Sequence, residues 1–233
     1  KQKREYSMLR SLVGSEMCIR DSSYYVWLTK QFTAPINVAI PSGNFGNAYS
    51  AWFGREHGLP INEILCSTNV NDVLRRFIDG GVLEPLVTQP SVAPSMDIQI
   101  PSSLERLIFD VSSEAKSFYD QLQTNSKAQL DEKSIDGLKN VFSSVSFSDV
   151  MITNLITSLH HEFAIIFDPH SVTSVQMALD NDSSIPTVAV ATASPEKFGN
   201  VISPLINDFT ESKIEEKEQY LTLGTENLSL IHI

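Results

Sequence analysis

The sequence is poor in cysteine, in positive charge and in long apolar runs. Cys18 and Cys66 are the only cysteines in 233 residues, which excludes a disulfide framework and suggests a reducing compartment, expected here to be the cytoplasm. Against 28 Asp and Glu there are 17 Lys and Arg, and the net charge of −11 argues against nucleic acid or an anionic membrane as partner. No apolar run is long enough to span a membrane, so we expect no membrane partner.

Common nucleotide and metal motifs are also missing. Neither a glycine-rich run ending in Lys-Ser/Thr nor a G-x-G-x-x-G occurs. His160, His161 and Glu162 are adjacent, but neighbours on a helix point in different directions, so we expect no metal site there. Cys66 lies in an apolar run and is interpreted as a small core residue. His170 lies at a predicted helix start, where a structural hydrogen bond is its expected role.

Both ends of the chain differ in character from the rest. Residues 4–22 (REYSMLRSLVGSEMCIRDS) and 227–233 (NLSLIHI) resemble translated sequencing-adaptor sequence. We therefore expect residues 1–22 and 227–233 to be foreign to the fold and to make few contacts with it. A targeting peptide is the alternative for the first stretch, although it lacks a continuous apolar segment. The domain prediction is one partial domain over residues 23–226, long enough to bury a sizeable core.

Short β-rich runs alternate with helical patterns along this domain. Strands are expected at residues 36–40, 63–67 and 187–191. A long loop is expected at 88–103, which holds three prolines, and short helices and turns at 124–146. Helices are expected over the following stretches: 23–30, 44–57, 72–79, 104–122, 148–162, 171–179 and 195–209. The predicted fold class is α/β, a mostly parallel sheet with flanking helices.

One strand–helix junction has an unusual composition. Between the first predicted strand and the next helix lies a polar, glycine-rich loop: Ser42, Gly43, Asn44, Phe45, Gly46 and Asn47. The first N–H groups of a helix lack partners and lie at the positive end of its dipole, where an anion binds favourably. Gly43 and Gly46 would let the backbone approach the anion and adopt angles that other residues resist, and the serine and asparagines would add side-chain bonds. The alternative is a turn whose Ser or Asn only caps the helix, and the local pattern leaves both open.

Four stretches match one known family in the same order. They begin at residues 38 (VAIPSGNFGNAYSAWFGREHGLPINEILCSTNVNDVLRRFIDGG), 91 (SVAPSMDIQIPSSLERLIF), 168 (DPHSVTSVQMA) and 187 (TVAVATASPEKF). Together they resemble the threonine synthases, which are pyridoxal 5′-phosphate (PLP) enzymes of fold type II, over residues 23 to about 209. The resemblance implies that the Ser42–Asn47 loop holds the PLP phosphate and that Thr192 bonds the pyridine nitrogen. Without the resemblance, Thr192 would be interpreted as a helix cap.

The resemblance also implies a reaction and a partner. Threonine synthases convert O-phosphohomoserine and water to threonine and phosphate with PLP as electron sink. Their Schiff-base lysine lies upstream in an F-K-D context that this sequence lacks. Six lysines of the domain are interpreted as solvated surface: Lys30, Lys116, Lys127, Lys133, Lys139 and Lys197. We therefore expect the C-terminal half of such an enzyme, with no catalytic residue of its own and the missing N-terminal half as its partner.

Two departures keep alternatives open. Ser194 stands where the family commonly has a histidine (ATAHPAKF), which puts a role for an imidazole at this place in doubt. A related fold type II lyase, such as a serine/threonine dehydratase, is the first alternative. A non-catalytic PLP- or phosphate-binding relative is the second, and the missing lysine context is the feature that favours it.

Overall fold

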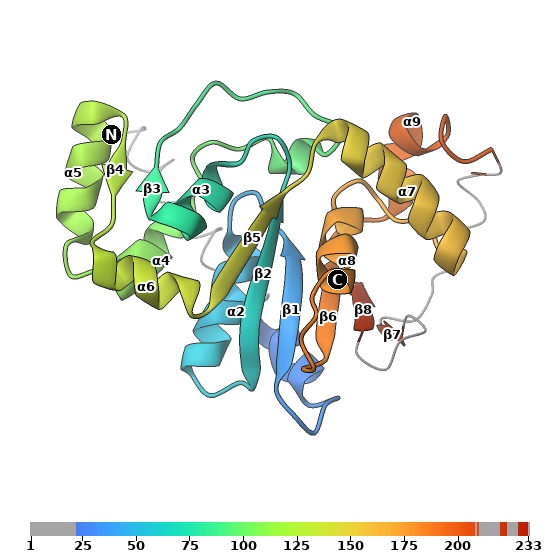
Figure 1. The fold of residues 1–233 in the computed structure, drawn as a ribbon, viewed down its shortest axis with the longest axis horizontal. Coiled ribbons are helices and arrows are strands. Elements are labelled where there is room, and N and C mark those ends of the chain that lie inside the picture. Colours follow the sequence, from blue (N-terminus) through green and yellow to red (C-terminus); the bar gives the residue numbers. More distant parts are fainter. Residues whose placement is uncertain (1–21, 208, 210–219, 223–227, 233) are drawn as a thin grey trace, which may run out of the picture.

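The computed structural model describes residues 22–207, 209, 220–222 and 228–232, and it is built on one six-stranded sheet of order β5-β2-β1-β6-β8-β7 (Figure 1). In chain order the strands are β1 (Ile36–Pro41), β2 (Ile61–Thr68), β5 (Phe142–Ser146), β6 (Thr187–Ala191), β7 (Tyr220–Thr222) and β8 (Leu228–His232). All neighbouring pairs are parallel except β7 with β8. The predicted mostly parallel sheet is confirmed.

The three predicted strands lie side by side at the centre of this sheet. Ala39 of β1 pairs with Leu65 of β2 on one side and with Ala189 of β6 on the other. Val38 and Ile40 belong to the core on one face, and Ala39 belongs to the core on the other, as the alternation of strand side chains requires. Because both faces are buried, these strands are apolar at successive positions, which is why the sequence shows them clearly.

Helices cover both faces of the sheet. The first core joins the sheet to helix 22–29, α2 (Gly46–Glu56) and α3 (Val73–Gly80). The second core joins it to α7 (Asp149–Phe163), α8 (Ser171–Leu179) and α9 (Gly199–Ile202). The predicted placement of helices 44–57 and 171–179 against the sheet is confirmed by α2 and α8 (Figure 1). In the described part of the chain, no helix has the length and apolar character needed to cross a membrane.

Two predicted helices are broken in the structure. The stretch 104–122 forms α4 (Leu104–Val111) and α5 (Ala115–Asn125), because Ser112 between them is extended (φ −123°, ψ 125°) and its hydroxyl accepts the N–H of Glu114. The stretch 195–209 forms a 3₁₀ turn, η2 (Pro195–Phe198), and then the short α9. The apolar periodicity is overridden at Ser112 by a local side-chain bond, and the second break falls at Phe198, the last residue of η2, which leaves the helical conformation (φ −120°, ψ 30°) before α9.

The weakly patterned stretch 124–146 contains more regular structure than predicted. It holds α6 (Glu132–Lys139), the short β4 (Ala128–Gln129), which pairs with β3 (Val82–Leu83), and the sheet strand β5. Figure 1 shows α3 to α6 and this small sheet grouped beside β5. β5 pairs only with β2, so it is an edge strand and tolerates polar side chains that hide a strand from periodicity.

The C-terminal stretch contradicts the expectation that residues 227–233 make few contacts. Residues Leu228–His232 form β8, which pairs in parallel with β6 along Thr187–Ala191. The physical reason is that β6 would otherwise present an open edge of N–H and C=O groups, and this edge accepts a short β-prone segment. Residues 1–21 lie outside the described residues, so the corresponding expectation for the N-terminal stretch stays a prediction, as does the foreign origin of both ends.

Candidate functional site

A cavity of about 330 Å³ lies at the carboxyl ends of β1 and β6. Its lining comes from residues 41–48, from Ser95 and Met96, and from His170, Thr192 and Ala193. β1 and β6 are adjacent parallel strands, so the segments that follow them meet at one edge of the sheet. The Ser42–Asn47 loop and Thr192 therefore line one cavity, as the sequence predicts; what the cavity binds stays a prediction.

The start of α2 presents unpaired backbone donors to this cavity. Among the described residues, no acceptor pairs with the backbone N–H groups of residues 43–48. The first bond of the helix runs from the N–H of Tyr49 to the carbonyl of Phe45 at 2.9 Å. Phe45 precedes the helix in a left-handed conformation (φ 68°) and makes no side-chain capping bond. A row of free N–H groups at the positive end of a helix dipole is suited to an anion, and the simple-cap alternative is not what the structure contains.

The polar side chains of the loop are partly engaged within the protein. The Ser42 hydroxyl is buried and donates to the carbonyl of Ile40 at 3.1 Å. The Oδ1 of Asn47 accepts the hydroxyls of Tyr24 and Tyr25 from helix 22–29. The side-chain NH₂ group of Asn47 is not hydrogen-bonded to any other described residue. In Asn44 likewise only the side-chain oxygen is engaged, by the N–H of Ser102 at 3.5 Å. Asn44 and Asn47 are thus the loop side chains whose NH₂ groups have no partner among the described residues, and both line the cavity, whereas Ser42 has a structural bond.

Gly43 and Gly46 differ in what they permit. A Cβ on Gly43 would lie 2.5 Å from the carbonyl oxygen of Ser95, so only glycine lets these two backbones approach. A Cβ on Gly46 would meet nothing closer than the Ser103 hydroxyl at 3.5 Å. Neither glycine has a positive φ, and the left-handed position in the loop belongs to Phe45. The expectation that both glycines supply unusual backbone angles is therefore wrong, and Gly43 is required by its contact with the opposite cavity wall.

A buried carboxylate network supports the other side of the cavity. Asp168 accepts the Nδ1 of His170 at 2.8 Å and also the hydroxyl of Ser171. His170 Nε2 accepts the backbone N–H of Ser95 at 3.1 Å, and Ser171 Oγ accepts the backbone N–H of Thr192 at 3.0 Å. The structural role expected for His170 is confirmed, but no sequence pattern indicates that this side chain lines the cavity beside Ser95. Their contact joins positions 75 residues apart, which no local pattern reveals.

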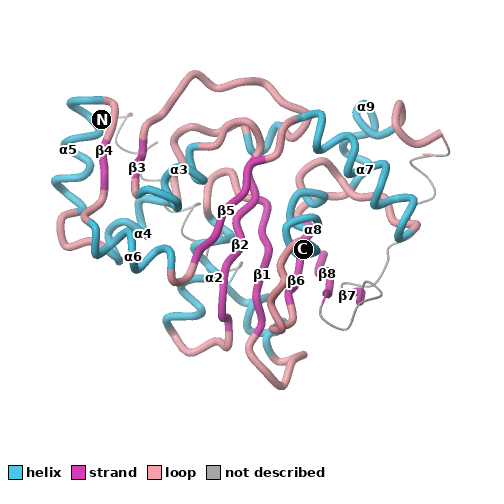
Figure 2. Tube along the Cα trace, in the orientation of Figure 1, coloured by secondary structure: helices cyan, strands magenta, loops and turns pink. Residues whose placement is uncertain are grey.

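The long predicted loop forms the wall that carries Ser95. It follows β3 and passes over the carboxyl edge of the sheet towards α7 (Figure 2). Its one regular piece in the described chain is the 3₁₀ turn η1 (Pro94–Met96). Asp97, just beyond η1, accepts the side-chain amides of Asn69 and Asn71 at 2.7 and 3.0 Å. Both asparagines are buried after β2, so the loop is anchored to the sheet through side chains rather than through strand pairing.

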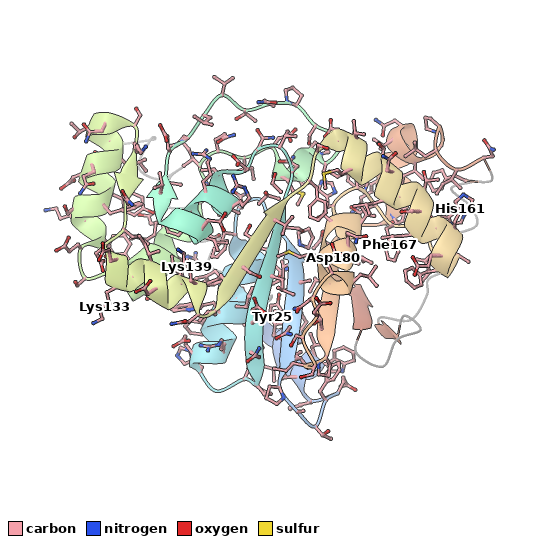
Figure 3. All side chains as sticks on the ribbon, viewed as in Figure 1. Tyr25, Lys133, Lys139, His161, Phe167 and Asp180 are labelled. Carbon is pink, nitrogen blue, oxygen red and sulfur yellow. The ribbon has the colours of Figure 1, made fainter. Side chains whose placement is uncertain are left out.

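Among the described residues, no Asp, Glu, Lys or Arg side chain lines the cavity, and the lysines lie elsewhere. All six predicted surface lysines are exposed, as expected: Lys30, Lys116, Lys127, Lys133, Lys139 and Lys197. Figure 3 shows Lys133 and Lys139 on α6, far from α8 and the cavity. Lys1, Lys3, Lys213 and Lys217 lie outside the described residues. Any anion in this cavity would be held by neutral donors and the helix dipole.

The remaining candidates of the sequence lie away from the cavity. Cys66 is fully buried on β2, and desolvation raises the pKa of its thiol to about 12, which confirms a core role and not a nucleophilic one. His160 and His161 lie on α7, where their ring centroids are 6.2 Å apart. Within the described residues, no group of three or more His, Cys, Asp or Glu side chains is arranged to hold a metal ion.

This chain combines a mostly parallel sheet and flanking helices with an unpaired helix start at the carboxyl edge of the sheet. Its structural neighbours, which are type II PLP enzymes, have the same fold. Comparison with known proteins supports this class and narrows it. The chain superimposes on a PLP-bound threonine synthase from Brucella melitensis with a TM-score of 0.80 at 23% identity, over 99% of this chain and 54% of that one. With the yeast threonine synthase the TM-score is 0.78 at 26% identity, over 93% of this chain and 49% of that one.

Sequence relatives point to the same family. The chain is 29% identical to the threonine synthase of Pseudomonas aeruginosa over 188 residues, which are 77% of this chain and 40% of that protein. It is 29% identical to the threonine synthase of Saccharomyces cerevisiae over 204 residues, and 28% identical to the human threonine synthase-like 1 over 218 residues. These matches cover 78% and 88% of this chain, and 40% and 29% of the two relatives. No family model matches the chain.

The resemblance to threonine synthases is thus confirmed, in sequence and in fold, over most of the chain. The chain spans about 40% of the length of the first relatives that it matches. These similarities do not show which residues of this chain bind a cofactor.

Proposed function

We propose that this chain supplies the phosphate-binding side of a PLP-dependent threonine synthase. The reaction class is a carbon–oxygen lyase acting on a phosphate ester, with O-phosphohomoserine as substrate and threonine and phosphate as products. The observation that carries the proposal is the row of unpaired N–H groups over residues 43–48, placed across one cavity from Thr192. Similarity to threonine synthases supports the choice of PLP over other anions.

The donors present fit the phosphate end of PLP. Phosphate oxygens accept hydrogen bonds from backbone N–H groups at a helix start without needing a positive side chain. The free NH₂ group of Asn47 adds a donor from the same loop. Bound PLP supplies an electron sink that stabilises negative charge developing on the substrate carbon. The chain itself binds the phosphate through the N–H groups of residues 43–48 and thereby orients the ring.

Thr192 is proposed to meet the opposite end of the cofactor. Its side chain is half-buried, lines the cavity and has no hydrogen-bond partner among the described residues. Its backbone is fixed, because its N–H donates to Ser171. A hydroxyl donates one proton to a pyridine nitrogen without placing a full negative charge beside it. Thr192 would therefore hold the ring nitrogen in a neutral hydrogen bond.

The lysine that the family requires is proposed to come from outside this sequence. Every lysine among the described residues of the domain is exposed and none lines the cavity, so this chain alone would bind PLP reversibly and turn over no substrate. The same observation favours a second candidate, a non-catalytic PLP-binding relative. A covalent adduct on a chain lysine would exclude that candidate and the reversible-binding proposal alike.

The test is the visible spectrum of PLP mixed with the purified chain, with and without borohydride, followed by mass spectrometry. We expect saturable binding that dialysis removes, and no single lysine that borohydride labels stoichiometrically. No release of phosphate from O-phosphohomoserine is expected from this mixture. If no saturable binding is seen up to millimolar PLP, the proposed cofactor site is contradicted. If borohydride labels one lysine stoichiometrically, the claim that the Schiff-base lysine lies outside this sequence is contradicted.

A further inference from the structure

Asp168 is a buried carboxylate whose partners are almost all neutral. It is 1% exposed and forms no ion pair with a Lys or Arg among the described residues. It accepts the backbone N–H and the Nδ1 of His170 at 2.9 and 2.8 Å, and the hydroxyl of Ser171. Burying a carboxylate without a cation is unfavourable unless its hydrogen bonds are complete. A carboxylate in this setting is suited to fixing the direction of the bonds around it.

The proton positions in this network follow from the two backbone groups at its ends. A backbone N–H can only donate, so the N–H of Ser95 requires that His170 Nε2 is an unprotonated acceptor. The ring proton is then on Nδ1 and is donated to Asp168. In the same way, the N–H of Thr192 requires Ser171 Oγ to accept, and the Ser171 hydroxyl proton is donated to Asp168. One carboxylate therefore orients two acceptors at once.

The two hydrogen-bond paths from Asp168, its two arms, end on two different segments that line the cavity, one at Ser95 and one at Thr192. Through His170, Asp168 holds the backbone N–H of Ser95. The carbonyl of the same residue approaches Gly43 so closely that a Cβ there would lie 2.5 Å from it. Through Ser171, Asp168 holds the backbone of Thr192. The first arm thus reaches the Ser42–Asn47 loop and the second reaches the proposed ring-nitrogen contact.

We propose that Asp168 is a positioning residue that sets the separation between the Ser42–Asn47 loop and Thr192 through these two arms. The proposal rests on the proposed function for its ligand, because it assigns the two arms to the two ends of PLP. It assigns a role in holding the cofactor site to Asp168, His170 and Ser171, which lie more than 100 residues after the Ser42–Asn47 loop in the sequence.

Two serines on α8 allow a test that distinguishes a positioning role from a general contribution to stability. Ser171 and Ser174 are both buried and both hydrogen-bonded, and neither lines the cavity. They differ in their partners, because Ser171 accepts the N–H of Thr192 whereas Ser174 donates to the carbonyls of Ser171 and Val190. We expect Ser171→Ala to speed amide hydrogen exchange at Thr192 by on the order of tenfold and to weaken PLP binding about fivefold, the effect of one lost hydrogen bond. Ser174→Ala is expected to leave both measurements unchanged.

The His170 arm is tested on the unsubstituted chain by ¹⁵N NMR of the imidazole ring. We expect the proton on Nδ1 and a bare Nε2 at neutral pH. A proton on Nε2, an unchanged Thr192 amide in Ser171→Ala, or equal loss of PLP affinity in both serine variants overturns the proposal. If the unsubstituted chain binds no PLP, the proposed function fails, while the amide exchange and the ring tautomer still decide whether Asp168 holds the two segments.

Discussion

At the residue scale, two threonines at opposite ends of β6 have different roles. Thr192 follows the strand at its carboxyl end, lines the cavity and has a hydroxyl without a partner among the described residues. Thr187 begins the strand, is buried and accepts a bond from the Asn37 amide at 3.4 Å. Replacement by valine keeps the shape of the side chain and removes only the hydroxyl, so the pair separates binding from stability.

We expect one valine variant to change PLP affinity and the other to change stability. Thr192→Val should weaken PLP binding about fivefold and change the free energy of unfolding by less than about 0.5 kcal/mol, because no protein bond is lost. Thr187→Val should lower the free energy of unfolding by about 1 kcal/mol and leave PLP affinity unchanged. Fluorescence titration with PLP and urea unfolding measure the two quantities. Loss of stability in Thr192→Val with unchanged affinity would show that its hydroxyl has a structural role.

The place of a single residue could be predicted where it follows from strand topology, and not where it depends on a side-chain or loop contact between distant segments. Thr192 and the Ser42–Asn47 loop could be placed together, because strand ends in a parallel sheet meet at one edge. The role of Gly43 could not be predicted correctly, since the carbonyl that excludes a Cβ belongs to Ser95 on a distant loop. The same holds for Asn47, whose oxygen is taken by two tyrosines of helix 22–29.

At the element scale, the end of α3 tests how strongly one turn depends on glycine. Gly81 follows the helix in a left-handed conformation (φ 67°), and a Cβ there would lie 2.5 Å from Ile135 Cγ1. We expect Gly81→Ala to lower the free energy of unfolding by about 2 kcal/mol or more, from backbone strain and the clash together. Urea unfolding followed by far-UV circular dichroism measures this change.

The neighbouring glycine is the control for this variant. Gly80 is the last residue of α3, and a Cβ there would meet nothing closer than Val82 Cγ2 at 4.0 Å. Gly80→Ala should leave stability unchanged or raise it by about 0.5 kcal/mol, because alanine is the better helix former. Equal destabilisation in both variants would mean that the left-handed turn is not the cause.

Elements were predicted well where both faces are buried and poorly where they are not. β1, β2 and β6 are central strands with continuous apolar runs, and all three were predicted. β5 was missed because it is an edge strand with the serine-rich sequence FSSVS. Helix 104–122 was predicted as one piece because the apolar stripe continues through the break at Ser112, where a local side-chain bond ends the first helix.

At the scale of the whole molecule, an acidic chain is proposed to bind an anionic ligand. The net charge of −11 repels phosphate at long range, and no Lys or Arg of the described part of the chain lines the cavity. Binding must therefore come from short-range bonds to the N–H groups of residues 43–48 and from the dipole of α2. The similarity to threonine synthases accounts for the fold, while the phosphate contact remains the central claim about this cavity.

That claim is tested most directly by comparing pyridoxine 5′-phosphate with pyridoxine as ligands of the chain, by calorimetry at 0.15 M salt. Neither compound has an aldehyde, so the exposed lysines cannot react with it, and the two differ only in the phosphate. If the N–H groups of residues 43–48 bind the phosphate, the phosphorylated ligand should bind at least about tenfold more tightly. Equal affinities for the two ligands, or tighter binding of pyridoxine, would contradict a phosphate site at the start of α2.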